Sequence, residues 1–323
     1  MIVYEPPQAA KHIPIVDFTD AFSADPAARK AVAWEIHKAG RETGFFYLTG
    51  HGVPEAVMAG QLAFAGRFFG QPLERKLDVR ITNSPCQRGY DPMGRQALDE
   101  DSPPDLKEGF MLGRDLGPDH PLIRRGVPFE GQNQWPDCVP GFRAQMETYL
   151  AEMIRLGRGL GAMLSLSLDL PEDYLEAGLS EPNCAVRLLH YPPHPANAAF
   201  NQLGAGAHTD WGLLTILLQD DKGGLEVRNA EGVWLRADPI PGTFVINMGD
   251  MVPRMTNGLY RSNLHRVLNK GDDRYSVATF FNPPADYVFA CAPTCEQLGE
   301  APPPCTFGEH IQDMMRRTQA APA

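Results

Sequence analysis

The chain has 323 residues, and 29 Lys and Arg against 40 Asp and Glu leave a formal net charge of −11 at pH 7. The acidic net charge disfavours a nucleic-acid partner, because phosphate binding needs a basic face. In addition, the sequence contains no run of Lys and Arg longer than two residues. No apolar stretch approaches the roughly 18–20 residues of a membrane span, so no membrane partner is expected. Hydrophobic residues at 43% and charged residues at 21% are typical of a soluble globular protein.

The N-terminal sequence and the spacing of the cysteines indicate in which cellular compartment the protein is expected. The first residues lack a basic segment followed by an apolar one, which is the pattern of a secretory signal. Six cysteines are scattered without a CxxC pair and are expected to be reduced thiols. We therefore expect a cytoplasmic protein that is a monomer or a weak homo-oligomer.

Apolar residues at helical spacing predict three helices in the first half of the chain. One covers 26–39, a second starts at Pro54, and a long third covers about 140–168. The apolar run 44–50 is bounded by glycines and predicts a short strand. Residues 83–139 are poorly patterned and rich in Pro, Gly and Asp, so this segment is either a functional insertion or holds short strands of its own.

Strand-length runs rich in Val, Ile, Thr and Phe dominate the second half, separated by turn residues. They cover residues 185–191, 213–219, 224–227, 233–235, 243–247 and 276–281. Strands at this spacing favour a sandwich or barrel, and a jelly roll closes the sheet edges best. Because no repeat or linker divides the chain, we expect one mainly β domain with flanking helices.

A metal-ligand pattern precedes one of these strands. In His208-Thr209-Asp210, the first and third side chains project to the same face of an extended chain. His265 lies 57 residues further on and can supply a third ligand. Two His and one carboxylate leave three positions open, which suits non-haem Fe(II), although a catalytic zinc site uses the same residue types.

A possible cosubstrate site follows the second histidine. Arg274 and Ser276 share one strand face, nine and eleven residues after His265. A planar guanidinium beside a hydroxyl suits the remote carboxylate of 2-oxoglutarate. Taken alone, the same pair also fits a surface strand with an exposed Arg.

These motifs together resemble the isopenicillin N synthase-like 2-oxoglutarate/Fe(II) dioxygenases. The resemblance is carried by HTDWGLLTILLQDDKGGLEV, NMGDMVPRMTNGLYRSNLHRVLN and RYSVATFFNP in the second half, and by HIPIVDF, GFFYLTGHGVP, RLLHYPP and FGEHIQDMMRRT elsewhere. It implies a single dioxygenase domain over 1–323 with a double-stranded β-helix (jelly roll) core. Within it we expect a helix-rich N-terminal region (1–180), the core with the iron and 2-oxoglutarate site (181–290), and a C-terminal helix (306–318).

The resemblance also implies the roles of individual residues. The iron ligands would be His208, Asp210 and His265, and the 2-oxoglutarate binders would be Arg274, Ser276 and Tyr191. The implied reaction oxidises, usually hydroxylates, a small organic molecule with dioxygen and releases succinate and CO2, without a catalytic residue beyond the metal site. Plant members often have Asn two residues before the Tyr, where this chain has Leu189. Three alternatives stay open: a 2-oxoglutarate-independent Fe(II) oxidase of the same family, a zinc hydrolase, and a non-catalytic cupin-like binding module.

Strand parity indicates substrate contacts. If Tyr191 faces the interior of the jelly roll, Arg187 faces it too, since side chains alternate with period two. A buried guanidinium is costly unless paired, so Arg187 could bind an anionic or carbonyl group of the substrate. Phe280 shares the face of Ser276 and could stack on a flat or apolar part. The alternative for Arg187 is an internal salt bridge to a carboxylate such as Asp105 or Glu108.

Overall fold

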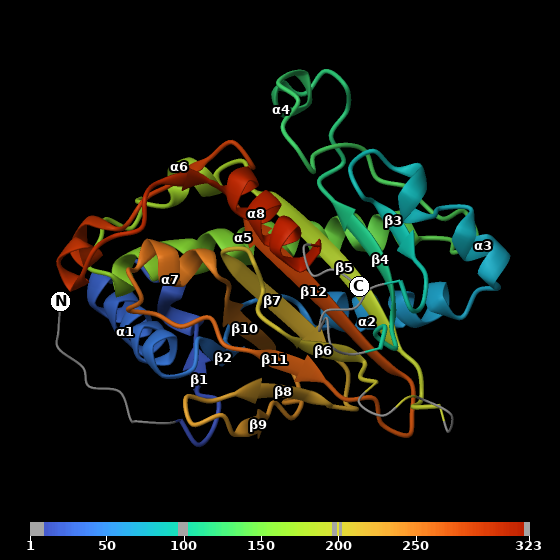
Figure 1. Ribbon diagram of the computed structural model, residues 1–323, viewed down its shortest axis with the longest axis horizontal. Helices are drawn as coiled ribbons and strands as arrows, with labels where there is room; N and C mark the ends of the chain where they lie inside the picture. The colour runs from blue at the N-terminus through green and yellow to red at the C-terminus, as the bar shows by residue number, and fades with distance from the viewer. Residues whose placement is uncertain (1–9, 96–102, 196–198, 200–201, 320–323) are drawn as a thin grey trace.

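A computed structural model describes residues 10–95, 103–195, 199 and 202–319, in which two sheets face one another (Figure 1). The major sheet has eight strands, in the order β1 (Ile15–Asp17), β2 (Phe45–Thr49), β10 (Phe244–Met248), β7 (Leu214–Gln219), β12 (Arg274–Asn282), β5 (Asn183–Tyr191), β4 (Glu108–Gly113) and β3 (Gly89–Asp91). The minor sheet has four, in the order β6 (Ala205–His208), β11 (His265–Val267), β8 (Leu225–Arg228) and β9 (Trp234–Arg236). A separate pair joins β13 (Val288–Phe289) to β14 (Cys305–Thr306).

Helices cover the face of the major sheet that points away from the minor sheet (Figure 1). The described helices are α1 (Pro26–Glu42), α2 (Glu55–Phe69), α3 (Leu73–Leu77), α4 (Pro121–Arg124), α5 (Phe142–Ser167), α6 (Glu176–Leu179), α7 (Met251–Met255) and α8 (Phe307–Gln319). Three 3-10 turns cover Thr19–Phe22, Ile81–Asn83 and Pro293–Leu298. In the part of the chain that is described, none of these helices is long and apolar enough to cross a membrane.

Local sequence sets where these elements begin and end. The helix α1 begins where the Asp25 carboxylate accepts a hydrogen bond from the Ala27 amide at 2.9 Å, with Pro26 in the first turn. The strand β2 has four successive buried residues, because helices cover one face of the major sheet and the minor sheet covers the other.

Two apolar layers result from this arrangement. The larger lies between the helices and the major sheet, where residues such as Phe68, Met153 and Phe281 are fully buried. The smaller lies between the two sheets and includes Val227 and Val245. Because the larger layer draws on both the N-terminal helices and the strands of the second half, the two halves share one core.

The predicted jelly roll is confirmed, as are the three helices, which the structure places at α1, α2 and α5. The segment 83–139 holds strands of its own, since β3 and β4 extend the major sheet beyond β5. The pattern of the sequence did not predict β6 or β11. They are four and three residues long, and β6 consists of Ala, Gly, Ala and His, so neither has an apolar alternation long enough to recognise.

Candidate metal and cosubstrate site

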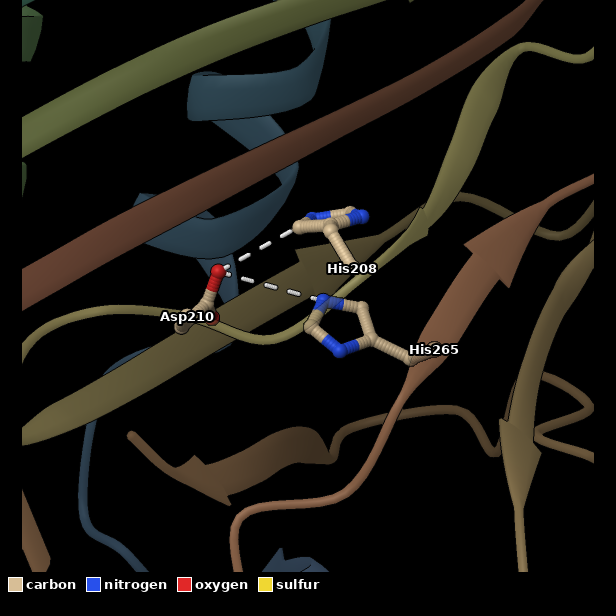
Figure 2. Close-up of side chains that lie close together, drawn as sticks. All are labelled: His208, Asp210 and His265. Carbon is tan, nitrogen blue, oxygen red and sulfur yellow. Dashed lines mark ion pairs between the residues drawn. The ribbon is translucent and has the colours of Figure 1, made fainter. Parts of the chain in front are cut away.

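Two short strands of the minor sheet bring three metal-binding side chains together. His208 ends β6 and His265 begins β11, where the two residues are direct cross-strand partners with ring centroids 4.2 Å apart. Asp210 follows two residues after His208. Figure 2 shows a carboxylate oxygen of Asp210 facing both rings. This atom, Oδ1, lies 3.9 Å from His208 Nε2 and 3.8 Å from His265 Nε2. Among the described residues, these are the ones that form such a cluster of potential metal ligands.

Hydrogen bonds with neighbouring groups leave one atom on Asp210 and one atom on His208 available to bind a metal. The Oδ2 atom of Asp210 accepts hydrogen bonds from Thr215 Oγ1 at 2.6 Å and from Asn247 Nδ2 at 2.8 Å, so Oδ1 faces the histidines. His208 Nδ1 lies 2.7 Å from the Gly206 carbonyl oxygen, which assigns the proton to Nδ1 and leaves Nε2 as an acceptor. Sequence reasoning missed Thr215 and Asn247, although each is a polar residue within an apolar strand.

The protonation states also fit a metal. Burial and the nearby His265 lower the pKa of His208 well below its usual value. Burial alone would raise the pKa of Asp210, but the two imidazoles and the hydrogen bonds from Thr215 and Asn247 lower it. A neutral imidazole and a carboxylate are the forms that bind a cation. Ligand atoms at about 2.0–2.2 Å from one ion lie about 3–4 Å apart, so the separations of 3.8 and 3.9 Å between Asp210 Oδ1 and the two Nε2 atoms suit a single divalent metal.

A cavity of about 330 Å³ between the sheets contains this cluster. Tyr191, Arg274 and Ser276 line the same cavity from β5 and β12, where Arg274 is paired with Tyr191 in the strand register. The Arg274 guanidinium carbon lies 4.7 Å from the centre of the Tyr191 ring, and Nη1 donates to Ser276 Oγ at 3.2 Å. The structure therefore brings together the three residues assigned to the cosubstrate and the three assigned to iron.

Arg274 is a buried cation that no carboxylate of the described residues neutralises within 4.0 Å. Its side chain is almost fully buried, Nη2 donates to Gln219 Oε1 at 3.4 Å, and Nε has no hydrogen-bond partner in this part of the chain. Burying a charge is costly unless it is paired. A small carboxylate that enters the cavity would supply the missing partner.

Arg187 and Phe280 also line the cavity. The Nη2 atom of Arg187 forms a salt bridge of 3.0 Å with Asp91 Oδ2 on β3, so an internal partner exists. The two partners suggested from sequence were wrong, because Asp105 pairs with Lys107 at 2.8 Å and Glu108 pairs with another lysine, on α3.

Comparison with known proteins identifies the family. Residues 182–283 match the 2OG-Fe(II) oxygenase superfamily, and residues 13–138 match the N-terminal region described as that of a non-haem dioxygenase in morphine synthesis. A 2-oxoglutarate-Fe(II) type oxidoreductase of Emericella nidulans is 38% identical over 312 residues, which cover 94% of this chain and 88% of the relative. A 2-oxoglutarate-dependent dioxygenase of Monascus ruber is 39% identical over 319 residues, covering 95% and 94%.

A solved structure shares the whole architecture. A full-length protein of Neurospora crassa, crystallised in complex with alpha-KG, superposes with a TM-score of 0.82 at 26% identity, covering 98% of this chain and 100% of that one. The chain belongs to the 2OG-Fe(II) oxygenase superfamily. It is a 2-oxoglutarate-dependent non-haem iron dioxygenase that uses Fe(II), 2-oxoglutarate and dioxygen to oxidise a small molecule, which decides against the zinc hydrolase and the binding module.

Proposed function

We propose that His208, Asp210 and His265 hold the Fe(II) of this dioxygenase, and that Arg274 and Ser276 bind the remote carboxylate of 2-oxoglutarate. The observation that carries this assignment is the shared cavity, in which three convergent metal ligands lie in the same space as a buried guanidinium that lacks a carboxylate partner. The Tyr191 hydroxyl is a further donor to the cosubstrate.

When bound, Fe(II) and 2-oxoglutarate supply the oxidising chemistry, in which dioxygen is consumed, succinate and CO2 are released and a C–H bond of the substrate is oxidised, in most cases to C–OH. The residues of this chain bind and orient the reactants. Thr215 and Asn247 hold the Asp210 carboxylate in place, and Arg274 neutralises the remote carboxylate of the cosubstrate. Apolar side chains of α8 line the cavity and exclude water: Phe307, Ile311 and Met315.

We place the primary substrate beside Phe280 and Arg187, since both side chains line the cavity. The ring of Phe280 offers a flat apolar surface. Arg187 keeps its salt bridge with Asp91 while it also donates to the substrate, because a guanidinium has five N–H donors.

The test is anaerobic loading of the purified protein with Fe(II) and 2-oxoglutarate, followed by exposure to dioxygen with a panel of metabolites. We expect succinate release that requires both Fe(II) and 2-oxoglutarate and that rises with the correct substrate. Full activity with no 2-oxo acid present, with ascorbate or the substrate as the only reductant, would contradict the cosubstrate assignment and favour the 2-oxoglutarate-independent oxidases.

We also propose that the chain acts as one domain, in the cytoplasm, as a monomer or weak homo-oligomer without a nucleic-acid partner. The shared core of the two halves supports the single domain, and the net charge of −11 supports the lack of a phosphate-binding surface. Sedimentation at several concentrations tests the assembly, and a stable tetramer at micromolar protein would contradict it.

A further inference from the structure

The lining of the cavity is cationic, although the chain as a whole is acidic. One carboxylate, Asp210, lies among the described lining residues, and four side chains there carry a positive charge: Arg88, Lys107, Arg187 and Arg274. Arg274 serves 2-oxoglutarate, so the other three positive charges need an explanation. A cavity with this excess of positive charge favours an anionic ligand besides the cosubstrate.

Internal partners neutralise two of the three remaining cations. Lys107 Nζ lies 2.8 Å from Asp105 Oδ2, and Arg187 Nη2 lies 3.0 Å from Asp91 Oδ2. For Arg88, no carboxylate among the described residues lies within the 4.0 Å of an ion pair. Arg88 is therefore a lining cation without a direct ion pair, and the buried Glu130 carboxylate acts on it only from beyond that distance.

The surroundings of the Arg88 guanidinium leave it undersatisfied. The residue is 3% exposed, Nη2 donates to the Phe129 carbonyl at 2.9 Å, and Nε has no hydrogen-bond partner among the described residues. The nearby Glu130 instead accepts a hydrogen bond from Asn183 Nδ2 at 3.0 Å. A buried guanidinium without an ion pair is costly, and a ligand anion in the cavity would lower that cost.

Specific contacts hold Arg88 in position. Its amide donates to Ser84 Oγ at 3.1 Å, and its carbonyl accepts from Gln134 Nε2 at 2.6 Å. Gly113 on β4 makes room for the side chain, because a Cβ there would lie 2.4 Å from Arg88 Nη2 and 2.6 Å from the guanidinium carbon. Such fixing of a cation before a ligand arrives reduces the entropy lost on binding.

Two residues next to Arg88, one in the sequence and one through a hydrogen bond, have left-handed backbone. Gln87, the preceding residue, has φ of 59°, and Phe129, whose carbonyl accepts from Arg88, has φ of 67°. Left-handed backbone is uncommon for residues other than Gly, Asn and Asp. Strained residues persist where the surrounding structure requires them, which is common at ligand sites. Both residues also line the cavity.

We propose that Arg88 binds the carboxylate of the primary substrate, and that the substrates are small monocarboxylic acids with a flat, apolar body. The inference rests on the proposed function, which assigns Arg274 to 2-oxoglutarate. Met111, Phe129 and Phe280 line the cavity and provide the apolar surface. A volume of about 330 Å³ is near the lower end of the ~300–1,000 Å³ range of small-molecule sites, so the acid must be small.

The first experiment uses the wild-type protein with Fe(II) and 2-oxoglutarate and without dioxygen. Calorimetry compares the binding of three acids, benzoate, phenylacetate and cinnamate, with their amides, benzamide, phenylacetamide and cinnamamide. We expect at least one acid to bind about 10- to 100-fold more tightly than its amide, the effect of one or two hydrogen bonds to a charged group. Equal binding of acids and amides, or no binding of any acid, overturns the proposal.

The second experiment locates the anion. Arg88→Gln should abolish the preference for acid over amide, and Arg88→Lys should keep part of it. Gly113→Ala keeps the charge but displaces the guanidinium, so it should weaken acid binding alone. The exposed Arg124→Gln is the matched control and should change neither affinity. An unchanged preference in Arg88→Gln overturns the assignment, and the wild-type comparison still tests the substrate class if this variant fails to fold.

Failure of this inference differs from failure of the proposed function. Succinate release that depends on 2-oxoglutarate, without any preference for acids, leaves the proposed function standing and removes the role of Arg88. Acid binding that depends on Arg88 in a protein that does not bind 2-oxoglutarate would contradict the proposed function instead.

Discussion

The two ends of the cavity are built in different ways. At the metal and cosubstrate end, His265 and Arg274 each begin a strand, and their neighbours across the sheet are set by the register of β6 and β5. At the other end, Gln87, Arg88 and Phe129 belong to irregular segments of 83–139, and two of them have left-handed backbone. The first end is held by sheet hydrogen bonds, and the second by individual side-chain contacts.

This difference indicates that the two ends of the cavity have different roles. A strand register fixes two facing side chains relative to each other, so it suits the reaction centre, whose geometry must not vary with the substrate. Irregular segments can accept substitutions that change the shape and charge of the cavity without disturbing the sheet, so they suit substrate selection. The two ends should respond differently to mutation: changes at the first should abolish the reaction, and changes at the second should alter what is bound.

The largest effect is expected at the proposed iron ligands. His208→Ala, Asp210→Ala and His265→Ala should each lower turnover roughly a thousandfold or more, since a catalytic metal contributes several kcal/mol. The fold should survive, because the surrounding sheets do not depend on these side chains. Succinate release and metal content of the purified variants measure the loss, and circular dichroism checks the fold. A variant with near-normal activity would exclude its residue from the ligand set.

Arg274→Leu should have the next largest effect. Loss of the guanidinium leaves the 2-oxoglutarate carboxylate without its charged partner, which costs roughly 3–5 kcal/mol and should raise the KM for 2-oxoglutarate strongly. The ligand-free variant should be as stable as the wild type or more stable, because it no longer buries an unpaired charge. Thermal unfolding with and without 2-oxoglutarate separates these effects. If 2-oxoglutarate stabilised both proteins equally, Arg274 would not bind it.

Substitution of Arg187 tests whether this residue contacts the substrate or only stabilises the fold. Both it and its partner Asp91 have side chains about 15% exposed, so Arg187→Met should lower the unfolding free energy by about 1–3 kcal/mol. Asp91→Asn is the matched control, since it breaks the same salt bridge and leaves the guanidinium in place. A substrate KM that rises in Arg187→Met but not in Asp91→Asn would establish contact with the substrate. Equal changes in both variants would make Arg187 structural.

The sequence predicted the first end of the cavity better than the second for a physical reason. Parity along an extended strand put Arg187 on the face of Tyr191 and Ser276 on the face of Arg274, and the structure brings all four into the cavity. No such periodicity applies to 83–139, so nothing in the pattern brought Arg88 near Phe129. The roles at the metal came from motifs and resemblance, whereas the supporting Thr215 required the three-dimensional structure.

A smaller effect is expected from a network of ionisable residues around His190. His190 lies on β5 beside Tyr191, but its side chain points to the opposite face. Its Nδ1 lies 2.8 Å from Glu108 Oε1 and its Nε2 lies 2.7 Å from Asp273 Oδ1, and Asp273 directly precedes Arg274. One imidazole ring thus connects β4, from the 83–139 segment, to the residue that precedes the strand with the 2-oxoglutarate binders.

Stability should depend on pH through this imidazole. Burial would lower the pKa of His190, but the hydrogen bonds to Glu108 and Asp273 outweigh it and raise the pKa above the usual value near 6.5. A raised folded-state pKa means that the stabilisation is complete below about pH 6.5 and is lost as the pH rises through the folded-state pKa. His190→Gln should therefore flatten the decline of unfolding free energy above pH 6.5, whereas the exposed His12→Gln should not. Urea unfolding from pH 6 to 9 measures both. If the pH dependence of the unfolding free energy were unchanged in His190→Gln, the charge on His190 would not link the two ends of the cavity. If the pH dependence were lost and the KM for 2-oxoglutarate rose a few-fold in the same variant, the link would be established.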